Sequence, residues 1–230
     1  MAPHRIVALV GDYYHAAEDM QRTLERLAAS LGYTLQAYTD PALLPWDSLG
    51  DYRALVMAKE NRVAPAQPPA QPPALWAAAA HEAAIAEFAA AGGAVIGLHN
   101  GLASYDQAGR YFQTVRGGFQ FHPKEHPRFA VRQVHPDHPI VAGFRPFELK
   151  DEMYFVRVDS PRTTKLLEVA HADYGTSCAA WAHEAGKGRV FCFTPGHTDE
   201  VLNDPGYLGV LERGLRWALR LEQVRESVIP

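Results

Sequence analysis

Histidines are the residues of this sequence best placed to do chemistry. The chain contains 11 of them, and three come just after predicted strands: His15, His99 and His197. Imidazole changes its protonation near neutral pH and serves as general acid, general base or metal ligand. Ligands of open α/β sheets gather beyond the carboxyl ends of parallel strands, so histidines at these positions predict a functional site.

The segment Gly97-Leu98-His99-Asn100-Gly101 has the spacing of a nucleophile elbow. In such an elbow, flanking glycines allow a strained turn that presents the central side chain at the edge of the sheet. The central residue here is an imidazole, so acyl-enzyme chemistry lacks its serine or cysteine nucleophile. We interpret His99 as a site residue; the alternative is a turn histidine that caps the following helix.

Further site candidates lie in the stretch 147–158, which we expect to be one extended strand. Alternation along it puts Glu152 and Tyr154 on one face and Asp151 on the other. Glu152 is a candidate partner for an imidazole, although a carboxylate at such a position also suits a solvated strand residue.

His197 follows the apolar run 190–193, and carboxylates come shortly after it. A carboxylate beside an imidazole fixes its tautomer and raises its basicity, as an acid/base or ligand histidine requires. The competing interpretation is a helix start, with Thr198 or Asp199 as the cap of the final helical region.

His122 precedes Pro123 in a stiff turn that follows the glycine pair 117–118. A site role and a plain surface turn fit this position equally well. Solvated turns explain most of the remaining loop histidines, namely His126, His135, His138 and His171.

Composition excludes several classes of protein. Hydrophobic residues make up 47% and charged residues 21%, so the chain can bury a core, and a net charge of -4 with no basic stripe argues against nucleic-acid binding. No apolar run approaches the roughly 20 residues that span a bilayer, and the first residues lack the features of a signal peptide. Cys178 and Cys192 form no disulfide or zinc pattern and lack the elbow spacing of an amidase nucleophile. We expect a cytoplasmic protein with inert thiols and neither nucleic-acid nor membrane partners.

The order of elements predicts a single α/β domain over residues 1–230. The first half alternates strands with helices, which implies a parallel sheet covered on both faces. Residues 63–74 hold five prolines and form a loop inserted in this domain. We expect strands over 6–10, 33–38, 52–58 and 94–98, and helices over 16–31 and 75–91.

The later part of the chain changes character, because its strands lack long intervening helices. This pattern predicts an antiparallel portion with a hairpin around Gly186-Lys187-Gly188. The amphipathic closing helix, over 208–221, fits packing against the sheet or against a second subunit of a homo-oligomer. The expected strands are 128–134, 147–158, 164–170, 179–183 and 189–194.

Several short motifs, in order over nearly the whole chain, resemble those of the ThuA-like proteins, a family named for trehalose utilisation within the class I glutamine amidotransferase-like superfamily. The motifs are Gly97 to Gly101, Val115-Arg116-Gly117-Gly118-Phe119 with His122-Pro123, Asp137-His138-Pro139-Ile140, Asp151-Glu152-Met153-Tyr154, Trp181, Gly186 to Phe191 and Gly196-His197-Thr198-Asp199-Glu200.

This resemblance implies a flavodoxin-like three-layer sandwich in which His99 holds the position of the amidotransferase cysteine. His197 and Glu200 look like remnants of the histidine–glutamate pair of the superfamily's true glutaminases, and glutamine hydrolysis is not expected because position 99 holds no thiol. The family is associated with carbohydrate metabolism. Ala16 follows His15 where the family often has an acidic residue, which argues against metal binding by this first loop.

Two hypotheses for function follow. The leading one is a sugar-processing hydrolase, lyase or isomerase that acts on a sugar-like ligand, either with a divalent metal such as zinc as its cofactor or, without a metal, with His99 and His197 as base and acid. The alternative is a non-catalytic binding or assembly module on a retired amidotransferase scaffold. For the enzyme, the catalytic candidates are His99, His197 and Glu152, the ligand-binding candidates are Tyr14, His15, Asn100, His122 and Tyr154, and the metal-ligand candidates are His99, His122 and His197.

Overall fold

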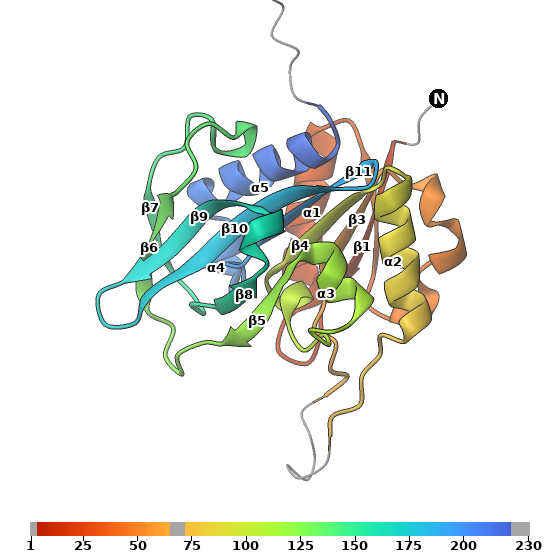
Figure 1. Ribbon diagram of the computed structural model, residues 1–230, viewed down its shortest axis with the longest axis horizontal. Helices are drawn as coiled ribbons and strands as arrows, with labels where there is room; N and C mark the ends of the chain where they lie inside the picture. The colour runs from red at the N-terminus through yellow and green to blue at the C-terminus, as the bar shows by residue number, and fades with distance from the viewer. Residues whose placement is uncertain (1–3, 65–71, 222–230) are drawn as a thin grey trace, which may run out of the picture.

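The computed structural model describes residues 4–64 and 72–221, so the middle of the proline-rich loop 63–74 lies outside the described residues. A nine-stranded sheet in the order β2-β1-β3-β4-β11-β10-β9-β6-β7 forms the centre (Figure 1). The parallel half comprises β2 (Thr34–Tyr38), β1 (Arg5–Val10), β3 (Ala54–Ala58), β4 (Ala94–Leu98) and β11 (Gly188–Phe193). The antiparallel half comprises β10 (Gly175–Ala185), β9 (Thr164–His171), β6 (Arg128–Gln133) and β7 (Phe147–Lys150).

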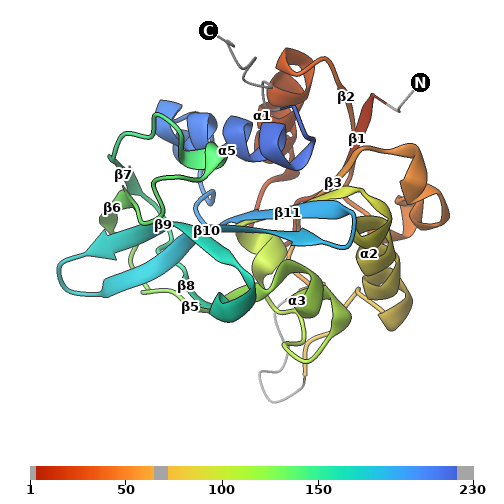
Figure 2. The ribbon, with the colours of Figure 1, turned by 45° about the horizontal axis from the view of Figure 1, so that its top comes forward.

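Helices cover both faces of this sheet (Figure 2). One face carries α1 (Ala17–Ser30), α4 (Asp199–Leu202) and α5 (Pro205–Ala218), and the other carries α2 (Ala79–Ala91) and α3 (Arg110–Val115). Alternate residues of β1 point into the two cores: Ile6 packs with the first set of helices and Val7 with the second. The three-layer α/β architecture expected from the sequence is confirmed.

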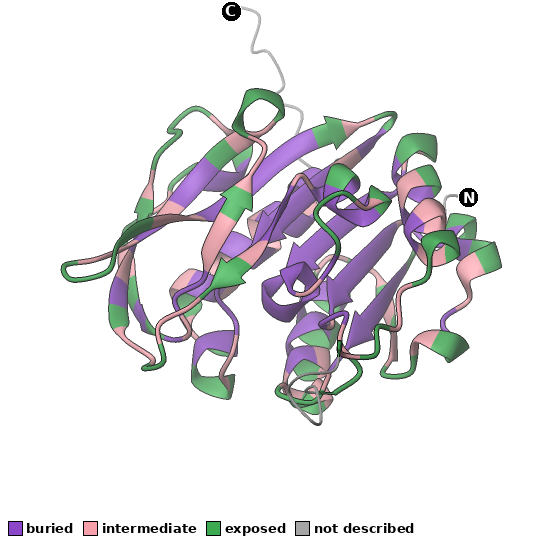
Figure 3. Ribbon diagram, turned by 60° about the horizontal axis from the view of Figure 1, so that its bottom comes forward, coloured by how far each residue is buried: buried purple, intermediate pink, exposed green. Residues whose placement is uncertain are grey.

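The parallel strands at the centre are apolar because both of their faces are covered. Every residue of β3 and β4 is buried, while the outer faces of the helices are exposed (Figure 3). In α1, Met20, Leu24 and Leu27 form the buried stripe, and Gly32 follows the helix at a φ of +77° that favours glycine.

A second, two-stranded sheet was not expected. It pairs β5 (Gly117–Phe121) with β8 (Phe155–Val158), so the prediction of one strand over 147–158 is wrong. The chain leaves the main sheet after β7 because the Asp151 carboxylate accepts hydrogen bonds from the backbone N–H groups of Gly196 and His197. The glycine pair 117–118 is part of β5, where Gly117 allows the close approach of Trp181.

Two predicted helix boundaries shift. The helix expected over 75–91 begins at Ala79, because Asn61 accepts hydrogen bonds from the backbone N–H groups of Trp76 and Ala77 and holds them extended. The helix expected over 208–221 is α5, which starts earlier because the Asp204 side chain caps it. Single 3₁₀ turns complete the fold as η1 (Pro41–Leu43), η2 (Trp46–Asp51), η3 (His99–Leu102), η4 (Pro139–Val141) and η5 (Ser160–Arg162).

Within the described residues, no helix combines the length and the apolar character needed to cross a bilayer.

Candidate metal centre and ligand pocket

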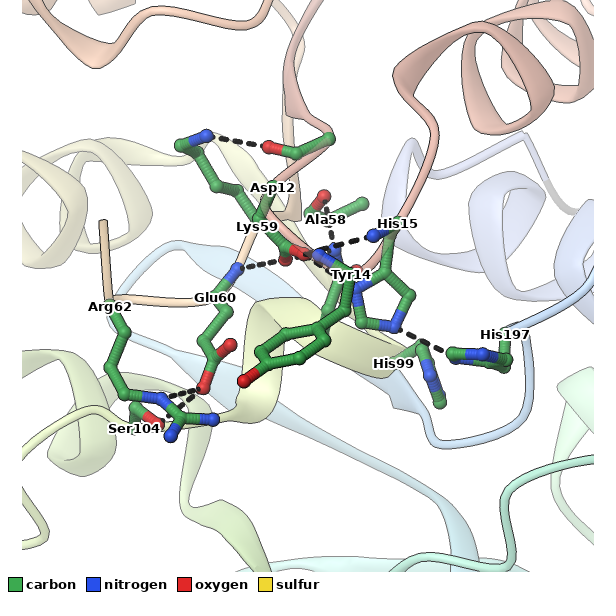
Figure 4. Close-up of polar contacts among 12 residues, drawn as sticks. Asp12, Tyr14, His15, Ala58, Lys59, Glu60, Arg62, His99, Ser104 and His197 are labelled. Carbon is green, nitrogen blue, oxygen red and sulfur yellow. Dashed lines mark hydrogen bonds and ion pairs between the residues drawn. The ribbon is translucent and has the colours of Figure 1, made fainter. Parts of the chain in front are cut away.

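The carboxyl ends of four neighbouring parallel strands meet at one edge of the sheet, and each delivers a polar side chain (Figure 4). Asp12 and His15 follow β1, Glu60 follows β3, His99 follows β4 and His197 follows β11. The order β2-β1-β3-β4-β11 reverses direction at β1, which is the topological switch point where open α/β sheets bind ligands.

His99 is fully buried at the start of the turn that follows β4. Its φ of +37° is the strained conformation expected of an elbow, and Gly101 makes the turn possible because a Cβ there would lie 1.9 Å from the Met57 oxygen. The ring Nδ1 donates to the Thr194 carbonyl oxygen at 2.8 Å. Nε2 therefore carries no proton in the neutral ring, and although it lies 3.4 Å from the Glu152 carboxylate, it forms no hydrogen bond with any described residue. A buried, unpaired nitrogen that faces a carboxylate is satisfied by a proton or by a metal ion.

Asp12 orients His15 and ties three strand ends together. Its Oδ1 accepts from His15 Nδ1 at 2.7 Å, and its Oδ2 accepts from Glu60 N at 2.9 Å and from Asn100 Nδ2 at 2.7 Å. Burial alone would raise the pKa of Asp12, but these hydrogen bonds hold it well below its usual range. Because His15 Nδ1 donates to Asp12, the His15 Nε2 atom is left as a bare nitrogen that faces the site.

Glu152 lies at the centre of a ring of imidazoles. Its Oε2 is 3.4 Å from His99 Nε2 and 3.3 Å from His197 Nδ1, and its Oε1 is 3.5 Å from His122 Nε2 and 3.7 Å from His126 Nε2. Burial alone would raise the pKa of Glu152, but His197 and His99 lower it far below the ordinary value. Glu152 is therefore an anion at neutral pH.

The loop after β11 places His197 against this carboxylate. Asp151 grips its backbone, with the Gly196 N–H donating to Oδ2 at 2.7 Å and the His197 N–H to Oδ1 at 3.2 Å. His197 Nδ1 also lies 3.0 Å from His15 Nε2. Burial lowers the pKa of His197, but the Glu152 carboxylate outweighs it and raises the pKa above the ordinary value.

Three imidazole nitrogens and one carboxylate oxygen converge here. One ligand atom each from His15, His99, Glu152 and His197 lies within 4.8 Å of the other three. Of the expected metal ligands, His99 and His197 belong to this set, whereas His122 lies beside the other oxygen of Glu152. His15 joins the set although the residue after it departs from the family pattern.

A cavity of about 300 Å³ opens beside the four residues. Of the expected ligand-binding residues, all but Asn100 line it; Asn100 is buried and donates to Asp12 and to the Ala58 carbonyl oxygen. The Tyr154 ring stacks on His99 with 4.2 Å between centroids, so it forms part of the wall and also fixes the imidazole plane. The lining residues are Tyr14, His15, Glu60, Arg62, Ala103, Phe119, His122, Glu152 and Tyr154.

The chain matches a known protein family. The family model ThuA, described as trehalose utilisation, matches residues 5–218. The chain belongs to the ThuA family. A carbohydrate-related role at the family level follows from this membership. No curated protein matches the chain.

ThuA-like proteins of known structure share the fold over nearly their whole length. One from Parabacteroides merdae has a TM-score of 0.76 at 14% identity, covering 96% of this chain and 91% of that one. One from Bacteroides uniformis has a TM-score of 0.72 at 18% identity, covering 94% and 92%. A β-galactosidase from Rahnella sp. R3 matches with a TM-score of 0.62 at 11% identity, covering 96% of this chain but only 32% of its own. At sequence identities this low, the structural similarity shows a common fold and nothing more.

The histidine–glutamate pair expected from the ThuA resemblance takes a different form. Glu200 is exposed in the first turn of α4, and the carboxylate beside His197 comes from Glu152 instead. The expected helix start is confirmed, because Thr198 Oγ1 accepts from the Val201 N–H at 3.3 Å. His197 thus sits directly before a capped helix and in the site at the same time.

Sequence reasoning missed several residues of the site. The sequence indicates a solvated turn for His126, and it places Asp151 on the strand face opposite Glu152. Glu60 and Arg62, which line the cavity, follow β3, and inspection of the residues after that strand would have found them. Asp12 was detectable in the same way, since it follows the glycine that closes β1.

Both cysteines lie away from this cluster. Cys192 is buried in β11, and Cys178 in β10 borders a separate groove. Burial raises the pKa of both thiols, that of Cys178 to about 12. These thiols are protonated at neutral pH and are poor nucleophiles.

Proposed function

We propose that this ThuA-family protein is a divalent-metal enzyme that transfers protons on a small sugar bearing a carbonyl group. The observation that carries the proposal is the convergence of His15, His99, Glu152 and His197, with one ligand atom of each within 4.8 Å of the others. The cavity beside them provides room for the ligand.

The donor set suits zinc or a similar borderline ion. Imidazole nitrogen and carboxylate oxygen are common zinc ligands, and catalytic sites often combine them. His15 and His99 each have their Nδ1 proton held by an acceptor, Asp12 and the Thr194 carbonyl oxygen, which leaves Nε2 toward the shared centre. This is how a protein fixes the tautomer of a metal-binding imidazole. A metal bound there would polarise an oxygen of the ligand.

The cavity exposes one end of this set to a ligand. His15 and Glu152 line it, whereas His99 and His197 lie behind them. Glu152 Oε1 faces His122 on the cavity side and is placed to take up a proton, and His122 Nε2 is placed to pass it on. Tyr154 and Phe119 provide flat surfaces for a sugar ring.

Proton transfer at a carbon next to a carbonyl fits better than cleavage of a glycosidic bond. Glycosidases generally use two carboxylates, one on each side of the bond. Among the described residues, only two carboxylates line the cavity, those of Glu152 and Glu60. Glu60 is already ion-paired with Arg62. An isomerase or lyase needs only one carboxylate beside the polarised carbonyl, and Glu152 offers Oε1 on the cavity side while its Oε2 faces His99 and His197.

Metal analysis tests the first half of the proposal. Protein purified without an affinity tag should contain zinc or a related ion, and calorimetric titration of the metal-free protein should show one site per chain. His99→Ala should weaken zinc binding by about 100-fold or more. His171→Ala, which removes an imidazole outside the site, is the matched control. Equal zinc affinity in both variants would contradict the assignment.

Isotope exchange tests the second half. The zinc-loaded protein should incorporate deuterium from D₂O into a carbonyl sugar. NMR measures this incorporation, with D-fructose and D-glucose as the first sugars tested. Glu152→Gln should abolish the exchange. Zinc binding and sugar binding without exchange would instead support the non-catalytic binding module.

We also place the protein in the cytoplasm. The two cysteines are free, and burial raises the pKa of both, as suits a reducing compartment. Fractionation of cells with an antibody against the protein checks this location.

A further inference from the structure

The cavity has a second polar end, away from the histidine cluster. Figure 4 shows Glu60, Arg62 and Ser104 on one side of the Tyr14 ring, and the imidazoles of the cluster on the other. Glu60 and Arg62 both line the cavity, so a ligand that reaches His15 and Glu152 can also reach them.

Glu60 is a buried carboxylate with one oxygen engaged and one free. Its side chain is only 4% exposed, and its Oε1 accepts hydrogen bonds from Arg62 Nε and, at 2.6 Å, from Ser104 Oγ. Its backbone N–H donates to Asp12 at 2.9 Å, which fixes the residue to the same support as His15. Among the described residues, none donates a hydrogen bond to Oε2.

Arg62 offers the complementary groups. Its Nε is bonded to Glu60, and its guanidinium lies over the Tyr14 ring with 5.7 Å to the centroid. The terminal N–H groups donate to no described residue. A free acceptor and free donors therefore lie side by side, held by an ion pair.

We propose that Glu60 and Arg62 form a recognition subsite for adjacent hydroxyl groups of an unphosphorylated sugar ring. This inference rests on the proposed function and names its substrate class. One hydroxyl donates to Glu60 Oε2 and its neighbour accepts from the Arg62 guanidinium, the pairing that a vicinal diol offers.

The charges select against anionic ligands. The guanidinium charge is balanced by the carboxylate that it touches, so the subsite is neutral as a whole. A phosphate or carboxylate placed against Arg62 would also face the free oxygen of Glu60, and this repulsion excludes it. The volume, about 300 Å³, lies at the lower end of the range for small-molecule pockets and suits one ring.

Binding measurements on the zinc-loaded protein test the subsite. The probes are D-glucose, D-fructose and trehalose, together with glucose 6-phosphate and fructose 6-phosphate. At least one neutral sugar should bind about tenfold more tightly than either phosphate. Glu60→Gln, which keeps the shape and removes the charge, should weaken that sugar by about tenfold and reduce the discrimination against phosphates.

Two further variants control the measurement. Glu82→Gln removes another buried carboxylate, which accepts from the Tyr111 N–H and does not line the cavity, and it should bind sugars like the wild type. Arg62→Lys keeps the charge but loses the planar fork, and it should weaken the neutral sugar by about fivefold or more.

The outcomes separate this inference from the metal proposal. Zinc titration of Glu60→Gln should match the wild type, since Glu60 is not among the four metal ligands. If zinc does not bind, the function proposed above fails, and the sugar titrations on metal-free protein still decide the subsite. Tighter binding of the phosphates, unchanged sugar affinity in Glu60→Gln, or no binding of any probe would overturn it.

Discussion

His197 Nδ1 lies 3.0 Å from His15 Nε2, although 182 residues separate the two histidines in the chain. Asp12 Oδ1 accepts a hydrogen bond from His15 Nδ1, so His15 offers only the lone pair of Nε2 at this contact. The orientation of the His15 ring toward His197 therefore depends on the Asp12 carboxylate, which contacts neither a ligand in the cavity nor His197.

Asp12→Asn should disturb this arrangement through its second oxygen. The amide oxygen can replace Oδ1 opposite His15, but the amide N–H₂ then faces the donors of Glu60 and Asn100. We expect zinc affinity to fall by roughly 10- to 100-fold and the free energy of unfolding to fall by about 1–3 kcal/mol. Calorimetric zinc titration and urea denaturation measure the two effects.

The control for this prediction is Asp19→Asn. Asp19 pairs with Arg22 on the surface of α1, so its loss should cost less than about 1 kcal/mol. Similar zinc affinities in the two variants would show that the orientation of His15 does not depend on Asp12.

Zinc should stabilise the folded protein in proportion to its affinity. At a free zinc concentration of 100 times Kd, the gain is about 2.7 kcal/mol, so Tm should rise with zinc and fall with a chelator. Glu152→Gln removes the charged ligand and should lose most of this response, while Glu200→Gln, exposed on α4, should keep it. A chelator-insensitive Tm in zinc-loaded wild type would contradict the metal centre.

Gly101→Ala should be strongly destabilising. The added Cβ would lie 1.9 Å from the Met57 carbonyl oxygen, which belongs to the backbone of β3 and cannot move aside alone. We expect a loss of about 2 kcal/mol or more in the free energy of unfolding. Gly50→Ala is the matched control, because no atom of a described residue other than its chain neighbours lies within 4 Å of its added Cβ. Equal stabilities by urea denaturation would show that the turn relaxes.

His183 should make the protein less stable in acid. It is buried in β10, where its Nε2 donates to the Thr114 carbonyl oxygen, and burial lowers its pKa from 6.5 to about 4. Between these values the unfolded chain binds a proton that the folded protein refuses, so stability present above pH 6.5 is lost as the pH falls toward 4. The loss amounts to roughly 3 kcal/mol.

Urea denaturation between pH 7.5 and 4.5 checks this dependence. His183→Gln keeps a donor for the Thr114 oxygen but does not titrate, so its free energy of unfolding should fall less steeply with acid. Parallel curves for the wild type and the variant would assign the acid sensitivity to other groups.

Much of the fold was predictable because the central strands are apolar on both faces. The runs that became β1, β4 and β11 end where polar residues begin, and the rule for open sheets placed His15, His99 and His197 at one edge. The loop between β7 and β8 was not predictable in this way. Its path depends on hydrogen bonds that the Asp151 carboxylate accepts from backbone N–H groups about 45 residues further along the chain, which no local periodicity records.

The same dependence on long-range hydrogen bonds explains the wrong predictions within the site. Glu152 was identified by residue type and family resemblance, while the strand assigned to it was wrong. His126 reaches Glu152 only because the chain leaves the main sheet, so its loop looks like any other polar turn in the sequence. Residues placed by a strand end were found, and residues placed by long-range hydrogen bonds were missed.

The position of β11 between β4 and β10 has a consequence for biosynthesis. A ribosome emits the first four parallel strands long before residues 188–193, so the growing chain holds β4 with an unpaired edge while residues 99–187 are synthesised. His197 follows this late strand, and the imidazole cluster therefore assembles only after β11 has been synthesised.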